Sequence, residues 1–308
     1  MKVWRVHLRP DADGIDPVDV CIRQKVVGIG WRVSRKPANK DEYWKLGEKE
    51  YGDRGWSRAA NAIGWRMKEG DLVWVRDFFG IYYLGKIEGD WQYRDDPENL
   101  KADIINVRPC KLYRVGTNVA GKIVNCFRSP ATVQQIHDET VEIFSILVFN
   151  KIANENLPVK RIDYIDIFSL LSDVDLEDVV GLYLQHTYGL LFLPSSRSRQ
   201  NTTISYEYQL IDPKTGHPVY VQVKSGNIVL DPSNYYRFPE TYYLFSPAGY
   251  ARPSMKKHVI CIERDEIERF LLKSRDYLPL NITAWIDFKE EYEGAYQKRA
   301  NKSVQRTR

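Results

Sequence analysis

Apolar and polar positions alternate over several short stretches within the first 128 residues of the chain. Such alternation predicts β-strands, because successive side chains of a strand point to opposite faces. Clusters of glycine, proline and aspartate between these stretches are typical of turns. A single helix is predicted over Gly55–Met67, where apolar residues recur at steps of three and four. We therefore expect a barrel-like β domain over residues 1–128, with strands over Trp4–Leu8, Val26–Val33, Asp71–Arg76, Ile81–Ile87 and Ile104–Val115.

The pattern changes after Ser129-Pro130. Apolar positions over Thr132–Ile152 have a roughly helical spacing, which predicts a helical connector within residues 129–164. Capping residues then precede a helix at Leu176–Tyr188 that ends at Gly189. A hairpin, two more strands and a helix are expected to follow it, at Ile204–Ile211, Val219–Lys224, Thr241–Phe245, Val259–Ile262 and Asp265–Leu272. Residues 165–308 thus predict a second domain, of α/β class.

Composition limits the type of protein without identifying it. A chain of 308 residues is long enough for two domains. It has no apolar run long enough for a membrane span and no apolar core of a signal peptide after Met1, so we expect a soluble cytoplasmic protein. The four cysteines form no CxxC pair, which favours free thiols. A net charge of +4 does not by itself indicate a partner.

An acid and an amine are expected to converge on the predicted hairpin. Strand alternation puts Gln222 and Lys224 on one face of the second strand, and pairing with the first strand brings Glu207 alongside them. Phosphodiester hydrolysis needs such a set, because its transition state gathers negative charge that a divalent cation and a lysine stabilise. Oxygen ligands suit Mg²⁺. The simpler interpretation is an exposed cross-strand ion pair.

This segment resembles the catalytic core of the PD-(D/E)XK nuclease superfamily, and within it the Mrr-type restriction branch. The resemblance implies a restriction-endonuclease-like domain with a mixed central sheet, in which Glu207 and Gln222 hold Mg²⁺, with Mn²⁺ as a substitute. It further implies that Lys224 serves the attacking water and the scissile phosphate, and that Glu177 on the first helix supports the site. Glu207 stands where most members have aspartate, and Gln222 replaces a second carboxylate. Asp212 is an alternative acid, but its strand parity differs from that of Glu207.

The first domain resembles PUA-like domains, especially the EVE group. The resemblance rests on Gly28-Ile29-Gly30-Trp31, Lys68-Glu69-Gly70-Asp71 and Gly85-Lys86-Ile87, which occur in the expected order. It implies a β-barrel that binds modified bases or RNA. Aromatic side chains can enclose a base, or can simply fill the core of the domain. The residues predicted to contact the base or the phosphate backbone are Trp31, Trp91, Tyr93, Arg197, Arg199, Lys256 and Lys257.

Together these observations predict a Mg²⁺-dependent DNA endonuclease that resembles a type IV restriction enzyme. The first domain is expected to read a modified base in foreign DNA, and the second to cut the backbone. Double-strand cleavage needs two active centres, which favours a homodimer. Two alternatives remain open: a structure-specific or nonspecific nuclease acting on DNA or RNA, and a nucleic-acid-binding module whose nuclease fold no longer cuts.

Overall fold

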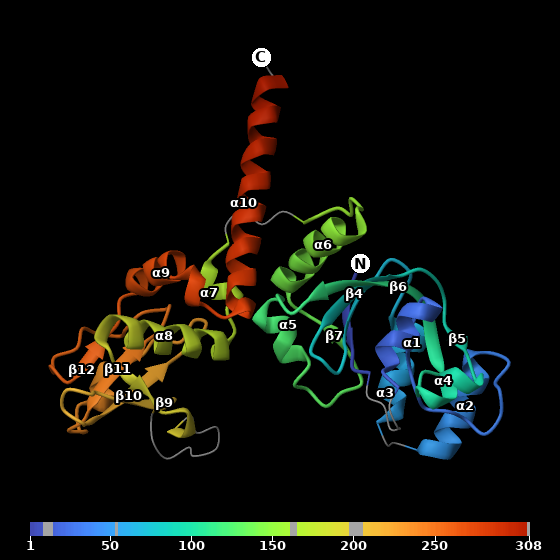
Figure 1. Ribbon diagram of the computed structural model, residues 1–308, viewed down its shortest axis with the longest axis horizontal. Coiled ribbons are helices and arrows are strands. Elements are labelled where there is room, and N and C mark those ends of the chain that lie inside the picture. Colours follow the sequence, from blue (N-terminus) through green and yellow to red (C-terminus); the bar gives the residue numbers. More distant parts are fainter. Residues whose placement is uncertain (9–14, 53–54, 161–164, 197–205, 307–308) are drawn as a thin grey trace. The chain divides into compact units, whose positions relative to one another are not determined.

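The computed structural model describes residues 1–308 except 9–14, 53–54, 161–164, 197–205 and 307–308, and describes side chains as far as residue 293. The chain divides into two compact units, Met1–Ile162 and Asp163–Arg308 (Figure 1). The structure is mixed α/β, with one sheet in each unit. Among the described residues, no helix combines the length and the apolar character that a bilayer crossing requires.

The first unit contains a curled, half-barrel sheet. Its strand order is β2-β6-β4-β3-β1-β7, with β5 beside β6. All five strands expected from the sequence are present, with bounds that differ from the expected ones by up to four residues. Pairing is antiparallel except between β1 and β3, which are parallel. The strands are β1 (Val3–Val6), β2 (Val26–Ile29), β3 (Leu72–Arg76), β4 (Tyr82–Ile87), β5 (Gln92–Tyr93), β6 (Asn106–Gly116) and β7 (Val133–Ile136).

Helices surround this sheet, and the region expected to be a helical connector belongs to the first unit. The helix predicted over Gly55–Met67 is confirmed, although its second half is a π-helical turn, η1 (Ala62–Arg66). The helical expectation for residues 133–136 is wrong, because these residues pair with β1 as the edge strand β7. The helices are α1 (Pro17–Gln24), α2 (Lys40–Tyr51), α3 (Trp56–Asn61), α4 (Pro97–Lys101), α5 (Gly121–Cys126) and α6 (Glu139–Ala153).

Ordinary core packing joins α6 to the sheet. The fully buried indole of Trp74 on β3 donates to the hydroxyl of Ser145 on α6 at 2.9 Å. Trp74 also stacks on Phe144, with ring centroids 6.4 Å apart. Burial of aromatic side chains of this size is worth several kcal/mol, on the order of 25 cal/mol per Å² of apolar surface. The segment 139–153 is therefore an integral part of the first unit.

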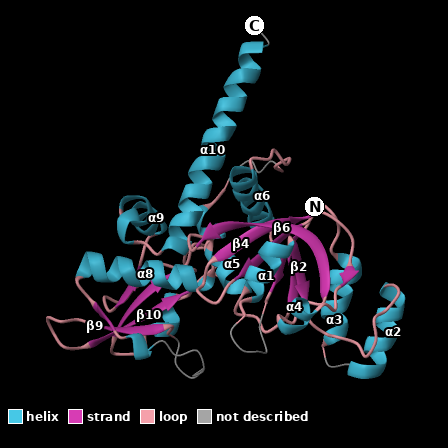
Figure 2. Cartoon of the chain, turned by 45° about the vertical axis from the view of Figure 1, so that its right-hand side comes forward, coloured by secondary structure: helices cyan, strands magenta, loops and turns pink. Residues whose placement is uncertain are grey.

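The second unit contains the expected mixed sheet, in the order β12-β11-β10-β9-β8. β8, β9 and β10 pair antiparallel, whereas β10, β11 and β12 pair parallel (Figure 2). The predicted order of helix, hairpin, two strands and helix is confirmed. The elements are α7 (Ile167–Leu170), α8 (Asp173–Tyr188), β8 (Leu191–Phe192), β9 (Tyr208–Ile211), β10 (Pro218–Val223), β11 (Thr241–Phe245), β12 (Val259–Cys261), α9 (Arg264–Lys273) and α10 (Leu280–Arg306).

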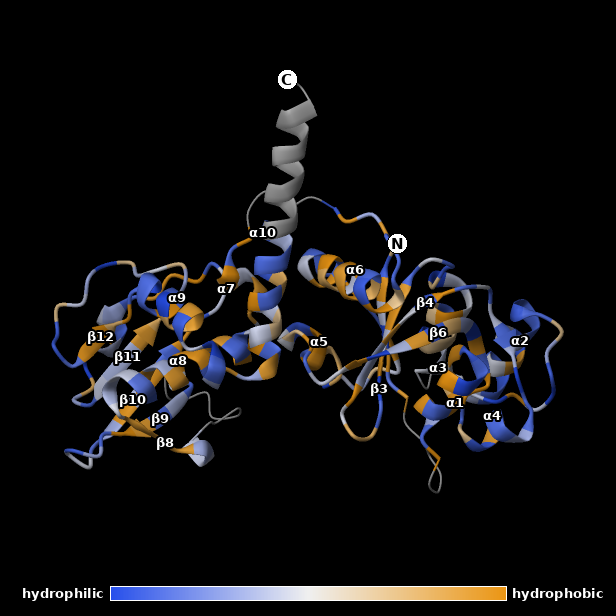
Figure 3. Cartoon of the chain, turned by 45° about the horizontal axis from the view of Figure 1, so that its top comes forward, coloured by the Kyte–Doolittle hydropathy of each residue, from blue (hydrophilic) through white to orange (hydrophobic). Residues whose placement is uncertain are grey.

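Helix α8 covers one face of the second sheet. A capping box between Ser172 and Asp175 starts the helix, and Gly189 in the left-handed conformation ends it. The hydroxyl of Tyr208 on β9 donates to the backbone carbonyl of Glu177 at 3.0 Å, which fixes the helix against this face. The neighbouring helix α9 is amphipathic: it carries both hydrophobic and hydrophilic residues (Figure 3), and its buried residues include Ile267.

An aromatic cluster covers the opposite face of the second sheet. Tyr242 on β11 stacks on Tyr220 of β10, with ring centroids 5.3 Å apart. Tyr235, from the 3₁₀ turn η3 (Pro232–Tyr235), packs on Tyr242 at 5.1 Å. This cluster buries the centre of the face and leaves polar side chains at the end of β10.

Candidate functional sites

Glu207, Gln222 and Lys224 come together at the end of the β9–β10 hairpin. Tyr208 pairs with Val221, and the amide of Glu207 extends the ladder by donating to the carbonyl of Val221 at 2.8 Å. Tyr208 faces α8. The neighbouring side chains of Glu207 and Gln222 therefore point to the opposite face of the sheet. Oε1 of Glu207 accepts from Nζ of Lys224 at 2.8 Å and from the amide nitrogen of Gln222 at 2.5 Å. The structure thus confirms that the carboxylate, the amide and the amine lie together, as the sequence predicted.

The cluster is buried at its base and open at its rim. Gln222 is 3% exposed, whereas the side chains of Glu207 and Lys224 are 27% and 37% exposed. Burial, and then the negative charge of Glu207, raise the pKa of the neighbouring Tyr235 to about 12. Tyr235 therefore stays a neutral phenol beside the carboxylate at ordinary pH. A solvent-accessible ion pair of this kind contributes at most about 1 kcal/mol to folding, so its energetic value does not explain the arrangement.

The oxygen atoms of the cluster fit a magnesium ion that keeps most of its water. Oε2 of Glu207 accepts no hydrogen bond from the described residues, and Mg²⁺ is commonly held by one or two carboxylates. Gln222 turns its amide nitrogen toward Glu207, and a half-turn of the amide presents its oxygen instead. The described part of the chain contains no group of three or more His, Cys, Asp or Glu side chains that could hold a metal ion. In the described cluster, Glu207 and Gln222 are the side chains that carry oxygen atoms.

The other residues predicted for this site lie apart from it or outside the description. Glu177 is on α8, the helix that packs on the opposite face of the sheet, so a supporting role for it stays a prediction. Lys256 and Lys257 are exposed in the turn before β12. Arg197 and Arg199 lie outside the described residues.

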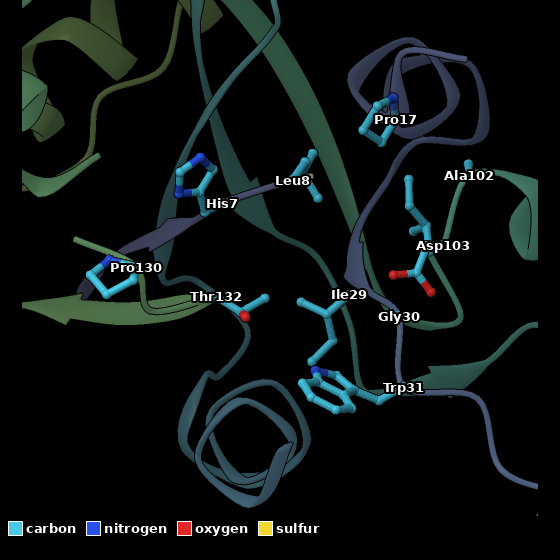
Figure 4. Close-up of a pocket in the computed structure, with 11 residues that line it drawn as sticks. His7, Leu8, Pro17, Ile29, Gly30, Trp31, Ala102, Asp103, Pro130 and Thr132 are labelled. Carbon is cyan, nitrogen blue, oxygen red and sulfur yellow. The ribbon is translucent and has the colours of Figure 1, made fainter. Parts of the chain in front are cut away.

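A cavity of about 160 Å³ opens in the first unit. Five separate stretches of chain line it: residues 7–8, 17, 29–31, 102–104 and 130–132. In Figure 4 the indole of Trp31 lies beside Ile29, with the hydroxyl of Thr132 on one side and the carboxylate of Asp103 on the other. The cavity thus combines apolar walls with a carboxylate, a hydroxyl and an aromatic ring.

The backbone around Trp31 is held in an unusual conformation by a buried amide. Trp31 has φ of +66°, a left-handed value that is uncommon for a bulky residue. Asn106 is fully buried and donates to the carbonyl oxygens of Gly30 at 2.5 Å and Trp31 at 3.4 Å. The hydroxyl of Tyr43 donates to the carbonyl of Trp31 at 3.1 Å. Such strain costs about 1–3 kcal/mol and persists only where its surroundings fix it, often at binding sites.

Helix ends account for the other left-handed residues, but not for Trp31. Lys25 and Asn154 are the C-caps of α1 and α6, and Asp103 comes two residues after the last residue of α4. Left-handed residues are common at these positions. Trp31 follows a strand, β2. Among the left-handed non-glycine residues that the structure describes, Trp31 is therefore the one that no helix end explains.

The three aromatic residues predicted to form a cage differ in their surroundings. Trp31 lines the cavity and also packs against the hydrophobic cluster beside it. Trp91 and Tyr93 pack on Tyr43 in that cluster, with ring centroids 5.5 and 5.9 Å from that of Tyr43, and do not line the cavity. The hydroxyl of Tyr93 accepts from the backbone nitrogen of Val33 at 3.0 Å. Trp91 and Tyr93 thus have the structural role that the sequence left open as the alternative.

Asp103 is the polar residue of the cavity that the sequence did not indicate. Its carboxylate lies so close to Gly30 that a Cβ on that glycine would come within 2.0 Å of Oδ1. The glycine therefore makes room for the acid. The sequence signal for this contact is Gly30, whose lack of a side chain leaves room for the carboxylate.

Comparison of the chain with protein-family models, with curated proteins and with solved structures finds no match. The two sites therefore rest on their own geometry.

Proposed function

We propose that this protein is a metal-dependent nucleic-acid hydrolase that cuts phosphodiester bonds at Glu207, Gln222 and Lys224. One observation carries the proposal: a carboxylate, an amide and an ammonium group meet on one sheet face, with Nζ of Lys224 2.8 Å from Oε1 of Glu207. Hydrolysis of a phosphodiester requires charge stabilisation on the attacked phosphate and a positioned water. These three side chains offer groups suited to both needs.

Each residue has a separate role in this proposal. Glu207 and the side-chain oxygen of Gln222 would hold the divalent ion, which supplies Lewis-acid stabilisation of the phosphate and a more acidic water. Lys224 hydrogen-bonds to the same carboxylate, so its ammonium group lies within reach of a phosphate bound there. It neutralises charge that develops on the non-bridging oxygens and orients the attacking water. Without the ion, Gln222, which is almost fully buried, donates to Glu207 through its amide nitrogen and holds the carboxylate in place.

The first unit would select the nucleic acid. Its cavity lies among the described residues 7–132 and holds an aromatic ring, a hydroxyl and a carboxylate. Those groups suit a base taken out of its stack, since flipped bases are read by hydrogen bonds and by contacts with aromatic side chains. We therefore propose a DNA endonuclease that depends on a modified base and acts on foreign DNA, with Mg²⁺ or Mn²⁺ as its ion.

Plasmid cleavage tests the hydrolase. The full chain is incubated with Mg²⁺ or Mn²⁺ and with plasmids that carry unmodified bases, 5-methylcytosine, 5-hydroxymethylcytosine or 6-methyladenine. We expect cutting of at least one modified plasmid in preference to the unmodified one. Lys224→Ala should lower the rate by at least about a hundredfold. Lys214→Ala, which removes an exposed lysine from the turn of the same hairpin, should cut like the wild type.

Three results would contradict the proposal in different ways. Wild-type rates in Lys224→Ala would exclude this lysine from the chemistry. Equal cutting of every plasmid would favour a nuclease that ignores modification. Binding of DNA without cutting would favour a nucleic-acid-binding module, an alternative supported by the single carboxylate of the cluster and by its closed ion pair with lysine.

A further inference from the structure

A row of tyrosine rings borders the proposed hydrolase site on the same face of the second sheet. Tyr220 lies two residues before Gln222 on β10, so both side chains point to this face, about 7 Å apart along the strand. The ring of Tyr220 packs on that of Tyr206, with centroids 4.8 Å apart, and stacks on that of Tyr242 at 5.3 Å. The row therefore begins one strand step from the cluster of acid, amide and lysine.

Tyr206 reaches this row because the chain departs from regular strand geometry. In a regular strand, Tyr206 would point to the same side as Tyr208, which faces α8. The chain bends at Glu207, and Tyr206 instead packs on the aromatic cluster of the opposite face. The residue directly before the candidate metal ligand is thus turned toward the face that carries the site.

The outer rings of the row remain accessible. Tyr242 is 2% exposed and forms the base of the row, whereas Tyr206 and Tyr220 are partly exposed. Every nucleobase has a flat face, and stacking on aromatic side chains binds single strands with little preference for sequence. In a duplex these flat faces are already stacked on neighbouring bases. Rings on the surface of a sheet are therefore suited to bases that have left a duplex.

The surroundings of the row also suit a nucleic-acid strand. Arg237 is exposed, and its guanidinium lies 4.9 Å from the ring centroid of Phe238 in the same aromatic cluster, so it offers a cation for a phosphate. Ile228 and Val229, in the loop that follows β10, are each 53% exposed. The nearly fully buried hydroxyl of Ser246 donates to the carbonyl of Ile228 at 2.6 Å and holds this loop. Stacking, charge and apolar contact are thus available on one side of the second unit.

We infer that Tyr206 and Tyr220 stack on an unpaired base of the strand that is cut, so that the substrate at this site is single-stranded DNA or a locally opened duplex. Arg237 contacts the phosphate backbone of that strand. Fully paired DNA must open before it can enter the site. This inference rests on the proposed hydrolase, whose substrate it specifies, but its test does not depend on cleavage.

Binding of unmodified DNA in EDTA tests the inference, because no cleavage can then occur. Fluorescence anisotropy of a labelled strand, and of the same sequence closed into a hairpin duplex, is measured with the full chain. We expect the single strand to bind at least about tenfold more tightly than the duplex. Tyr206→Leu should weaken single-strand binding by about tenfold, as loss of one stacked base predicts, and Tyr206→Phe should retain it. Tyr277→Leu, at a tyrosine that is 61% exposed elsewhere in the second unit, should bind like the wild type.

Photocrosslinking of a strand that carries 5-iodouracil gives a second measurement, made on the wild-type chain. We expect a crosslink to Tyr206 or Tyr220, identified by mass spectrometry of the peptides. Absence of any crosslink to these two residues would overturn the inference, as would equal affinity for strand and duplex or wild-type affinity in a folded Tyr206→Leu. Failure of the hydrolase is separate, since it would show up as absence of cutting with Mg²⁺ while these binding results stand.

Discussion

Asn106 and Gln222 are buried side-chain amides, one in each unit, and they fix different kinds of partner. Asn106 donates to the backbone carbonyls of Gly30 and Trp31, so it holds main chain in a strained form. Gln222 donates to Glu207, whose side chain remains 27% exposed. The first amide builds a rigid wall for recognition, whereas the second supports a carboxylate that stays open to solvent, ions and substrate. The comparison predicts that binding and chemistry can be removed separately.

The largest expected effect tests that separation directly. Lys224→Ala should lower the cleavage rate by a factor of at least about a hundred and leave the preference for binding DNA with the modified base unchanged. Asp103→Asn should change the preference and retain cleavage of DNA at high protein concentration. Plasmid cleavage is measured on both variants, together with the fluorescence anisotropy of labelled DNA with and without the modified base. The first measurement checks the chemistry and the second checks the binding preference. Loss of both properties in either variant would mean that the two sites are one functional unit.

A smaller effect is expected from the amide that holds the wall. Asn106→Leu leaves the carbonyl of Gly30 without this donor and the indole nitrogen of Trp91 without its acceptor, which costs about 1–3 kcal/mol for each unsatisfied group. Thermal unfolding should therefore occur several degrees lower, and the preference for binding DNA with the modified base should disappear. Ser145→Ala, which removes the fully buried acceptor of the Trp74 indole and lines no part of the cavity, is the control for lost stability alone. Equal loss of preference in both variants would contradict a specific role of Asn106.

The two sites also differ in how far the sequence predicted them. Glu207, Gln222 and Lys224 were predictable because a hairpin makes residues neighbours through local register. The cavity was not, because its walls come from five stretches between residues 7 and 132 that only the complete sheet brings together. The same limit explains β7, whose strand conformation depends on the unpaired edge of β1. Trp91 and Tyr93 show the converse: composition marks aromatic residues, but only packing decides which of them remain accessible.

Tyr235 provides a prediction about pH in the second unit. Its raised pKa, about 12, means that the folded chain keeps a proton that the unfolded chain loses near pH 10. Its contribution to the free energy of unfolding therefore falls as pH rises from 10 toward 12. Tyr235→Phe should unfold with a weaker pH dependence in that window, by up to about 1 kcal/mol per pH unit. Urea denaturation at pH 9 to 11 measures the difference, and Tyr277→Phe, at an exposed tyrosine, should behave like the wild type.

The smallest change in stability should come from Gly30→Ala, although it tests the wall most sharply. The added Cβ would approach Oδ1 of Asp103 within 2.0 Å, and the carboxylate can move aside because it ends a short side chain. We expect about 1 kcal/mol of lost stability, at the low end for an added methyl group because the displaced atoms belong to a side chain, and a clear loss of the preference for DNA with the modified base. Gly64→Ala, where a Cβ would meet nothing within 4 Å, is the matched control. If Gly30→Ala retains the preference, recognition does not depend on the position of Asp103, and the rigid wall held by Asn106 would then serve folding alone.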